Sequence, residues 1–266
     1  MENKLNLIQA KKSLGQNFLV DENIAKKIVD SLKLQDNDFV IEIGPGTGAL
    51  TRHLVKYKNI DLTLIEIDER AVEVLIKDYG QNKINIISSD FLALDLNKIN
   101  SNGRKIKVVG NLPYYIASQI IFKILENSVL FEKAVFMLQK EMAQRIISKH
   151  GNKVYGIMSV ALAICGKASI LFDVAPGCFL PKPKVTSSVL EVNFLDKNLK
   201  YFEIMKIVKL GFNQRRKMLR NALHQTLSDV TNYEQNEVIT KYLTKRAEQL
   251  SLEDFIILSE EIIKGR

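Results

Sequence analysis

The sequence is poor in the residues that build disulfide frameworks and metal sites. Its 266 residues include no tryptophan, two cysteines and three histidines. Cys165 and Cys178 are too few for a disulfide framework and lack the paired spacing of a zinc site. The histidines lie outside every motif described below. We therefore expect a protein of a reducing compartment that binds no metal.

Long apolar segments are also missing. The longest apolar run, Tyr155 to Cys165, is far shorter than the roughly 20 residues that a membrane helix needs. The first residues carry Lys4, Lys11 and Lys12 but no apolar stretch typical of a signal peptide. We expect a soluble, cytoplasmic protein with no membrane partner, and nothing in the sequence demands more than a monomer.

Positive charge is in excess and is concentrated in one place. The formal net charge is +8 at pH 7, which alone is weak evidence for a polyanionic partner. Between residues 200 and 221, however, Glu203 is the single acid. The basic residues of that stretch are Lys200, Lys206, Lys209, Arg215, Arg216, Lys217 and Arg220. Such a local patch favours a nucleic-acid contact over a solvated face.

Apolar strand-like runs alternate with helical patterns through the first two thirds of the chain. This alternation predicts βαβ units and a parallel sheet covered by helices on both faces. Two later runs, 168–174 and 187–195, are too close for a crossover helix and should form an antiparallel hairpin. The fold class is therefore α/β and Rossmann-like. The five expected parallel strands are 39–44, 62–68, 84–90, 105–111 and 133–139.

The pattern changes to helix alone after Asp196, with apolar residues at three- and four-residue spacing. We predict one domain over residues 1–196 and a small helical domain over 197–266. The expected helices of the second domain are 200–213, 216–228, 234–243 and 251–264.

A glycine-rich loop, "EIGPGTGALT" (42–51), should join the first strand to its helix, which we expect from about Gly48 to Lys56. Gly44, Gly46 and Gly48 permit tight turning and a close approach of the backbone to a ligand at a helix N-terminus. The loop also satisfies a permissive dinucleotide fingerprint. By itself it does not decide between NAD and S-adenosylmethionine.

Polar groups end three successive strands. Glu66 stands where an acid would take ribose hydroxyls, Asp90 could accept from an adenine amine, and Asn111 ends the fourth strand. Asp90 alone could be an ordinary helix N-cap. Together they fit a cofactor with a ribose, an adenine and an amino-acid tail, which is S-adenosylmethionine.

The stretch "NLPYY" (111–115) fits a site for a flat base with an exocyclic amine. Asn111 and the Leu112 carbonyl could accept the two amine hydrogens, and Pro113 would hold that carbonyl in place. Tyr114 could stack on the base, which is worth about 1–3 kcal/mol. Such a base must be unpaired or flipped out of its stack. The purely structural alternative is a turn whose tyrosines pack against neighbouring residues.

These motifs resemble the ribosomal RNA adenine N6-dimethyltransferases that act on the small subunit, and the similarity covers nearly the whole chain. Thr186 departs from it, because many relatives carry an acid there. The matching stretches are "KKSLGQNFL" (11–19), "EIGPGTGALT", "GNLPYY", "FMLQKEMAQRI" (136–146), "FLPKPKV" (179–185), "FNQRRKMLRNAL" (212–223) and "RAEQLS" (246–251).

The resemblance implies a class I S-adenosylmethionine-dependent methyltransferase fold and assigns residues to it. The segment 1–20 would close over the cofactor. The base would lie between Tyr114 and Phe179, with Asn111, Leu112 and Pro113 at its amine. The implied cofactor-binding residues are Gln16, Asn17, Leu19, Gly44, Gly46, Glu66, Ile67, Asp90, Phe91 and Asn111.

The resemblance also implies the substrate. It would be two adjacent adenosines in a hairpin near the 3′ end of small-subunit (16S) rRNA, converted to N6,N6-dimethyladenosines. Arg215, Arg216, Lys217 and Arg220 would bind its phosphates. The alternatives are an Erm-type methyltransferase of the large subunit, a non-catalytic RNA-binding relative, and a dehydrogenase, for which the sequence offers no hydride-accepting pocket.

Overall fold

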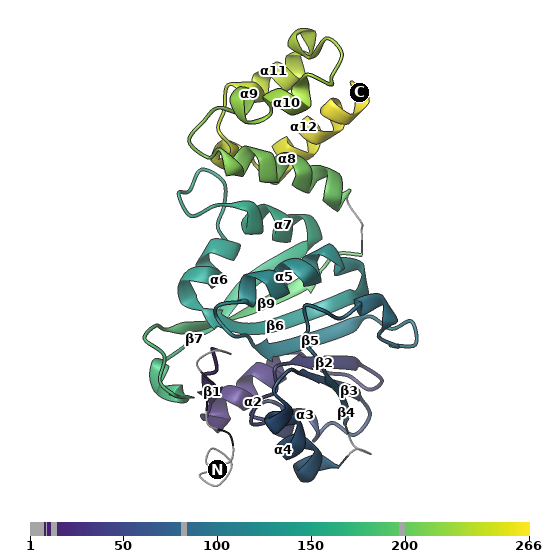
Figure 1. Cartoon of the computed structure of the whole chain (residues 1–266), viewed down its shortest axis with the longest axis vertical. Helices are drawn as coiled ribbons and strands as arrows, with labels where there is room; N and C mark the ends of the chain where they lie inside the picture. The colour runs from purple at the N-terminus through teal and green to yellow at the C-terminus, as the bar shows by residue number, and fades with distance from the viewer. Residues whose placement is uncertain (1–7, 9, 12–14, 81–83, 197–199) are drawn as a thin grey trace. The chain divides into compact units, whose positions relative to one another are not determined.

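The computed structural model describes residues 8, 10, 11, 15–80, 84–196 and 200–266. Figure 1 shows the whole chain. The chain divides into two compact units, one of residues 1–143 and 168–196 and the other of residues 144–167 and 197–266. Part of the predicted closing segment 1–20, with Lys4 and Lys12, lies outside the described residues, as do residues 12–14 of "KKSLGQNFL" and the start of the predicted second domain at 197–199.

The first unit is built on a seven-stranded sheet in the order β4-β3-β2-β5-β6-β9-β7. The first five strands along the chain pair in parallel, and β9 is antiparallel to β6. The predicted α/β class with five parallel strands is confirmed. The strands are β2 (Phe39–Ile43), β3 (Asp61–Glu66), β4 (Asn85–Ser88), β5 (Ile106–Asn111), β6 (Phe131–Gln139), β7 (Gly166–Val174) and β9 (Ser187–Phe194).

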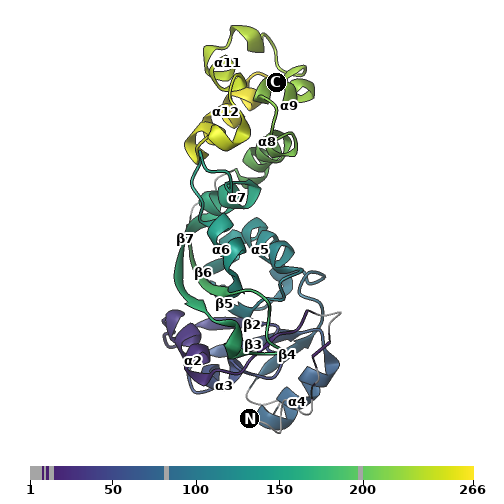
Figure 2. The ribbon, with the colours of Figure 1, turned by 90° about the vertical axis from the view of Figure 1, so that its left-hand side faces the viewer.

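Helices cover both faces of this sheet (Figures 1 and 2). On one face, Val40, Leu64 and Val109 pack with Ile28 of α2 in a buried cluster. Successive side chains of a strand point to opposite faces of the sheet, so residues of neighbouring strands in this register share one face. The helical elements are α2 (Glu22–Ser31), α3 (Thr51–Leu54), α4 (Glu69–Tyr79), η2 (Leu96–Lys98), α5 (Ala117–Glu126), η3 (Ser128–Leu130) and η4 (Pro176–Cys178), with α6 (Lys140–Ile146) starting in this unit.

A second, two-stranded sheet joins the N-terminal segment to the loop after β7. Strand β1 (Phe18–Leu19) is antiparallel to β8 (Phe179–Leu180), with Leu19 opposite Phe179. Neither this pairing nor α2 was predicted. Asp21, whose side chain accepts from the amides of Asn23 and Ile24 at 2.9 and 3.0 Å, was a readable N-cap for α2.

The second unit is helical, as predicted, but its first segment comes from the middle of the chain. Residues 144–167, assigned from sequence to the first domain, group with it. They pack there through apolar contacts, for example between the rings of Tyr155 and Phe212, 5.9 Å apart. Its helices are α7 (Ile157–Cys165), α8 (Tyr201–Asn213), α9 (Leu219–Ala222), α10 (His224–Leu227), η5 (Tyr233–Gln235), α11 (Glu237–Leu243), η6 (Ala247–Gln249) and α12 (Leu252–Lys264).

Two predicted helices are shorter than expected. The expected helix 48–56 is helical only over α3. The expected helix 216–228 is replaced by a turn over 214–218 and by α9 and α10. The amide of Leu219 donates to the Lys245 carbonyl at 2.8 Å, so it is not available to a continuous helix. Among the described residues, no helix is both long and apolar enough to cross a membrane.

Candidate functional site

A cavity of about 360 Å³ opens at the carboxyl ends of β2, β3, β4 and β5. The chain order reverses here, because β3 and β5 lie on opposite sides of β2. Open α/β sheets bind ligands at such a point, and the volume suits a small molecule. Most predicted site residues line it, namely Gln16, Asn17, Leu19, Gly44, Gly46, Glu66, Ile67, Asp90, Phe91, Asn111, Leu112, Pro113 and Tyr114.

The glycine-rich loop after β2 shapes one side of this cavity. Gly44 and Gly46 have φ angles of +65° and +53°, which side chains rarely tolerate. A Cβ atom at Gly46 would lie 3.0 Å from the Phe18 ring, whereas one at Gly44 would meet no atom within 4 Å. Gly44 therefore leaves open space beside the cavity, and Gly46 lets the N-terminal segment pack against the loop.

Glu42, at the start of the same loop motif, is a lining residue to which the sequence assigned no role. Its side chain is buried, with 1% of the residue exposed, and accepts a 2.7 Å hydrogen bond from the Thr51 hydroxyl. Burial raises the pKa of Glu42 to about 8, although the Thr51 bond opposes this. At neutral pH its carboxyl is therefore largely protonated until a cation comes near.

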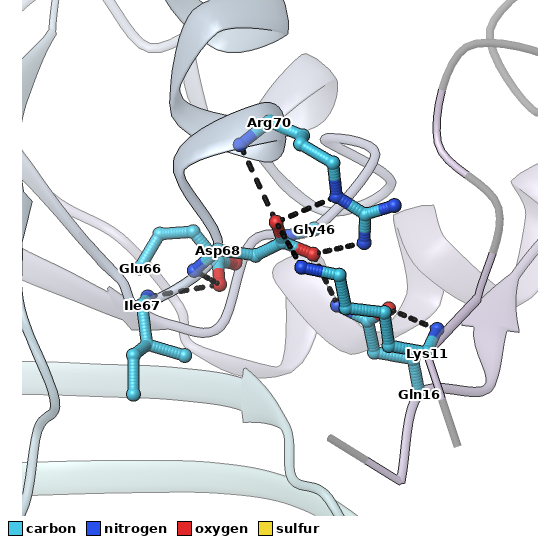
Figure 3. A network of polar contacts seen from close by, with 7 residues as sticks. All are labelled: Lys11, Gln16, Gly46, Glu66, Ile67, Asp68 and Arg70. Atoms are coloured by element: carbon cyan, nitrogen blue, oxygen red, sulfur yellow. Dashed lines mark hydrogen bonds and ion pairs between the residues drawn. The ribbon is translucent and has the colours of Figure 1, made fainter. Parts of the chain in front are cut away.

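Glu66, at the end of β3, is held by three backbone amides (Figure 3). Its Oε2 accepts from Gly46 at 2.9 Å, and its Oε1 accepts from Ile67 and Asp68, each at 2.9 Å. Burial raises the pKa of Glu66, and the three amide bonds oppose that rise. Oε2 accepts from one donor among the described residues and has a second lone pair, so it can also accept from a ligand hydroxyl.

Asp90 and Phe91 follow β4 in a loop whose backbone accepts hydrogen bonds from Lys123 of α5. The Lys123 ammonium donates to the carbonyls of Phe91 at 2.9 Å, of Leu92 at 2.8 Å, and of Leu94. Asp90 Oδ1 accepts from the Leu92 amide at 2.9 Å, and no described residue donates to Oδ2. An acceptor at the cavity thus stays available on a loop whose backbone is tightly held.

Asn111 and Leu112 present two acceptors at the end of β5. Asn111 Nδ2 donates to the Asn17 carbonyl at 2.9 Å, which leaves Oδ1 without a donor among the described residues. The Leu112 amide donates to Met137 at 3.0 Å, and its carbonyl takes no bond from the described residues. Pro113 follows and restricts this peptide. The pair fits an amine with two hydrogens.

Tyr114 is held by its hydroxyl, 2.7 Å from the Ser187 hydroxyl on β9. Burial raises the pKa of Tyr114, although the Ser187 bond opposes this, so the phenol stays neutral. Tyr115, for which no role was predicted, also lines the cavity and is 55% exposed. Its ring packs against Gly15, where a Cβ would lie 2.7 Å from it.

Phe179 lies apart from the other predicted site residues. It does not line the cavity, is 3% exposed, and packs in the buried cluster that contains Leu19 and Val189. Its backbone position in β8, opposite β1, nevertheless places it beside the cavity-lining segment. The predicted stacking role of Phe179 stays a prediction.

The N-terminal segment is bound to the end of β3 through Asp68 (Figure 3). Gln16 Nε2 donates to Asp68 Oδ2 at 3.0 Å, and Lys11 Nζ lies 3.9 Å from Oδ1. Arg70 donates to both carboxylate oxygens. The Arg70 guanidinium, with help from Gln16 and Lys11, lowers the pKa of Asp68 to about 2. The sequence did not single out Asp68 or Arg70.

The predicted RNA-binding residues belong to the second unit and lie in and after the turn that follows α8. They are not on one helix, because α8 ends at Asn213 and α9 begins at Leu219. Arg215 Nε donates to Glu248 at 2.7 Å, and its guanidinium also donates to the Lys153 carbonyl. Arg216, Lys217 and Arg220 are exposed and form no ion pair with a described residue. They are the available cations of this patch.

The lining fits S-adenosylmethionine. Asp90 Oδ2 and the second lone pair of Glu66 Oε2 offer acceptors to an adenine amine and a ribose hydroxyl, and Gly44 leaves room at the glycine-rich loop. Ile67, 52% exposed, and the buried Phe91 supply apolar surface. A buried, neutral Glu42 near the same loop can gain a charge beside the cationic end of such a ligand.

Comparison with protein families gives one match that spans the chain. The model for ribosomal RNA adenine dimethylase matches residues 7–264. The ribosomal RNA small subunit methyltransferase A of Flavobacterium johnsoniae is 43% identical over 258 residues, 96% of each chain. The protein of the same name from Francisella tularensis subsp. novicida is 42% identical over 260 residues, 94% of this chain and 97% of the relative.

Solved structures share the fold. A dimethyladenosine transferase from Plasmodium falciparum superposes with a TM-score of 0.78 at 25% identity, covering 93% of this chain and 98% of that one. The 23S rRNA methyltransferase ErmE superposes with a TM-score of 0.68 at 22% identity, covering 93% of this chain and all of that one. The second similarity concerns the fold alone.

Proposed function

This chain belongs to the ribosomal RNA adenine dimethylase family, and from that premise we propose that it methylates N6 of two adjacent adenosines in a hairpin near the 3′ end of small-subunit (16S) rRNA. The products are N6,N6-dimethyladenosines, made during ribosome biogenesis by a cytoplasmic monomer. The observation that carries the proposal is the pair of free acceptors at the end of β5, Asn111 Oδ1 and the Leu112 carbonyl, beside a cavity that fits S-adenosylmethionine.

The chemistry asks the protein mainly to orient a poor nucleophile. The lone pair of adenine N6 is delocalised into the ring. Asn111 Oδ1 and the Leu112 carbonyl accept its two hydrogens, which holds the nitrogen nearer to tetrahedral and directs the lone pair. S-adenosylmethionine, when bound, supplies a methyl group on a sulfonium that is already activated. Positioning and electrostatics then suffice, and the proton leaves from the product ammonium without a dedicated base.

The cofactor is proposed to lie along the strand ends. Glu66 takes the ribose, Asp90 takes the adenine amine, and Ile67 and Phe91 flank the adenine. Gly44 and Gly46 face the methionine end. Asn17 and Leu19 cover the cofactor from the N-terminal segment, with Gln16 beside them. The three amide bonds to Glu66 support this arrangement, because they hold its carboxylate at the cavity before any ligand enters.

The target base is proposed to stack on Tyr114, with Phe179 as the second aromatic wall. The Ser187 hydroxyl holds the hydroxyl end of Tyr114 in place before the base arrives. Phe179 is buried in the structure. Its role therefore requires a movement of the loop that carries β8, and replacing Phe179 by leucine tests that role separately from the rest of the site.

The RNA is proposed to contact the second unit through its phosphates. Arg216, Lys217 and Arg220 are exposed and available for such contacts, and Arg215 is the least available of the four because it is paired with Glu248. RNA helices are recognised largely by shape and backbone. The sequence-specific step is therefore the capture of an extruded adenine at Asn111 and Tyr114.

The decisive experiment is methyl incorporation from labelled S-adenosylmethionine into undermethylated small ribosomal subunits, with the product nucleosides identified. We expect dimethyladenosine at two neighbouring positions. Isolated large subunits serve as the control, and incorporation there instead would favour the Erm-type reaction. Bound cofactor without incorporation into either subunit would favour the non-catalytic, RNA-binding function.

A further inference from the structure

The segment of residues 15–19, here called the N-terminal strap, connects the carboxyl ends of β3 and β5. Gln16 bonds to Asp68, two residues beyond β3, and the Asn17 carbonyl accepts from Asn111 at the end of β5. Gly15 packs on the Tyr115 ring. All of the strap residues line the cavity. The strap therefore contacts the cofactor side and the acceptor side of the same site.

The contact at Asn111 determines which way its amide faces. A backbone carbonyl can only accept, so the Asn17 carbonyl selects Nδ2 of Asn111, 2.9 Å away. The amide group is planar, and Oδ1 is then directed away from the strap. In the opposite orientation, Nδ2 would point at the hydrogens of a target amine, which is repulsive. The strap thus selects the amide orientation that the reaction needs.

The contact at Asp68 determines where the strap lies. Gln16 Oε1 accepts from the Lys11 amide at 2.8 Å, so Nε2 is the group that faces Asp68. The Asp68 side chain is 1% exposed and is itself fixed by the guanidinium and the amide of Arg70. Figure 3 shows these groups converging on the one carboxylate. Gln16 consequently meets a buried, rigid, charged acceptor.

We propose that Asp68 is a positioning residue for methyl transfer, acting through Gln16 and the strap to hold the Asn17 carbonyl against Asn111. The inference rests on the proposed function, since it presumes an amine acceptor at Asn111. It also changes the role of Gln16, which the sequence assigned to cofactor binding. A segment that merely covered the cofactor would affect cofactor affinity alone, whereas a segment that orients Asn111 affects the rate at saturation.

The test uses the strap side of the contact, because Asp68 also caps α4 by accepting from the Arg70 amide. Gln16→Met removes the donor to Asp68 at similar size, and Gln16→Lys keeps a donor to it. Both lose the bond from Lys11, so they differ in the link to Asp68. We expect Gln16→Met to lower kcat about tenfold at saturating cofactor and RNA, as loss of one bond to a charged group would. Gln16→Lys should restore most of the rate.

A second variant approaches the contact from the other side. Asp68→Asn keeps an oxygen for the α4 cap but places an NH₂ group against Gln16 Nε2, so its kcat should fall like that of Gln16→Met. Cofactor affinity by calorimetry and melting temperatures accompany each rate. A change in cofactor affinity with kcat unchanged, or equal loss in Gln16→Met and Gln16→Lys, would overturn the proposal. Failure of the proposed function is distinguishable, because it would leave the wild-type protein without dimethyladenosine product.

Discussion

The cavity of the first unit and the basic turn of the second differ in how their polar groups are held. In the cavity, Glu66 accepts three backbone amides, and Asn111 is fixed by the strap. In the basic turn, by which we mean residues 214–220 including the start of α9, Arg216, Lys217 and Arg220 are exposed and form no ion pair with a described residue. One region holds its polar groups in place, and the other presents exposed positive charge.

This difference separates two kinds of contribution to one reaction. Groups fixed in place before the substrate arrives contribute through geometry, which salt screens little once water is excluded. In the proposed function, the exposed cations contribute through the release of counterions from the RNA, which depends steeply on salt. Variants in the cavity should therefore change rates, and variants in the turn should change salt-dependent affinity.

The largest effect is expected where geometry matters most. Asn111→Ala removes the proposed amine acceptor and should lower kcat by about 100- to 1000-fold, the range seen when one preorganised group is lost. RNA affinity should stay within about twofold, because the basic turn is untouched. Methyl incorporation and RNA binding measure the two quantities. Asn193→Ala, at an exposed position on β9, is the matched control. An unchanged rate in Asn111→Ala would remove the proposed acceptor from the mechanism.

Glu42 tests how much stability the folded protein loses when a carboxyl buried at the cavity ionises. Its folded pKa of about 8 exceeds the usual 4.5, so the folded state binds the proton more tightly than the unfolded state. The contribution of this group to the free energy of unfolding should therefore be highest below pH 4.5, and should fall by about 4 kcal/mol as pH rises to 8. Urea unfolding of the cofactor-free protein at several pH values measures it.

In Glu42→Gln this pH-dependent loss should disappear, while the hydrogen bond from Thr51 can persist to the amide oxygen. Glu73→Gln, at an exposed carboxyl on α4, should leave the pH profile unchanged. Parallel profiles for wild type and Glu42→Gln would show that Glu42 ionises normally in the folded protein.

The basic turn is tested by removing charge without touching the cavity. Replacing Arg216, Lys217 and Arg220 by glutamine should weaken RNA binding roughly 10- to 100-fold at 0.1 M salt and reduce the salt slope by about 1 for each phosphate that is no longer neutralised. The rate at saturating RNA should hardly change. The matched control removes equal charge from exposed lysines of the first unit, Lys56, Lys58 and Lys77. Equal losses in both triple variants would mean that net charge, not this surface, binds the RNA.

The smallest effect is expected at Lys123. This lysine supports the loop after β4 that carries Asp90 and Phe91, and it does not itself line the cavity. Lys123→Met leaves the carbonyls of Phe91, Leu92 and Leu94 without their shared donor. Affinity for S-adenosylmethionine should fall about fivefold to tenfold, since hydrogen bonds to a charged group are each worth about 1.5–3 kcal/mol and water replaces part of them. Calorimetry measures this. Lys98→Met, at a largely exposed lysine, should bind S-adenosylmethionine with unchanged affinity. Unchanged affinity in Lys123→Met would show that the loop keeps its conformation without the lysine.

Local patterns in the chain were sufficient for the sheet and for the residues at its edge. Apolar runs with short helical spacers predicted five parallel strands, and the polar residues at three strand ends predicted Glu66, Asp90 and Asn111 at one cavity. Both inferences follow from strand geometry, since parallel strands bring their carboxyl ends to one edge. They need no knowledge of distant contacts.

Contacts between distant residues were not predictable in this way. The Leu219–Lys245 bond breaks the expected basic helix, and packing of residues 144–167 moves them into the second unit. The sequence did not single out Asp68, and the structure places Gln16, 52 residues earlier in the chain, against it. Periodicity carries no information about such pairs.

The sequence by itself determined the fold class, the family and most of the residues that line the cavity, because period, spacing and residue chemistry are local properties. Only the tertiary structure decided how these groups are oriented. The amide of Asn111 acquires its direction from the Asn17 carbonyl, and the Tyr114 hydroxyl is held by Ser187, 73 residues away. The orientation of a side chain depends on the position of its hydrogen-bond partner. When that partner is distant in the sequence, only the folded structure brings the two together.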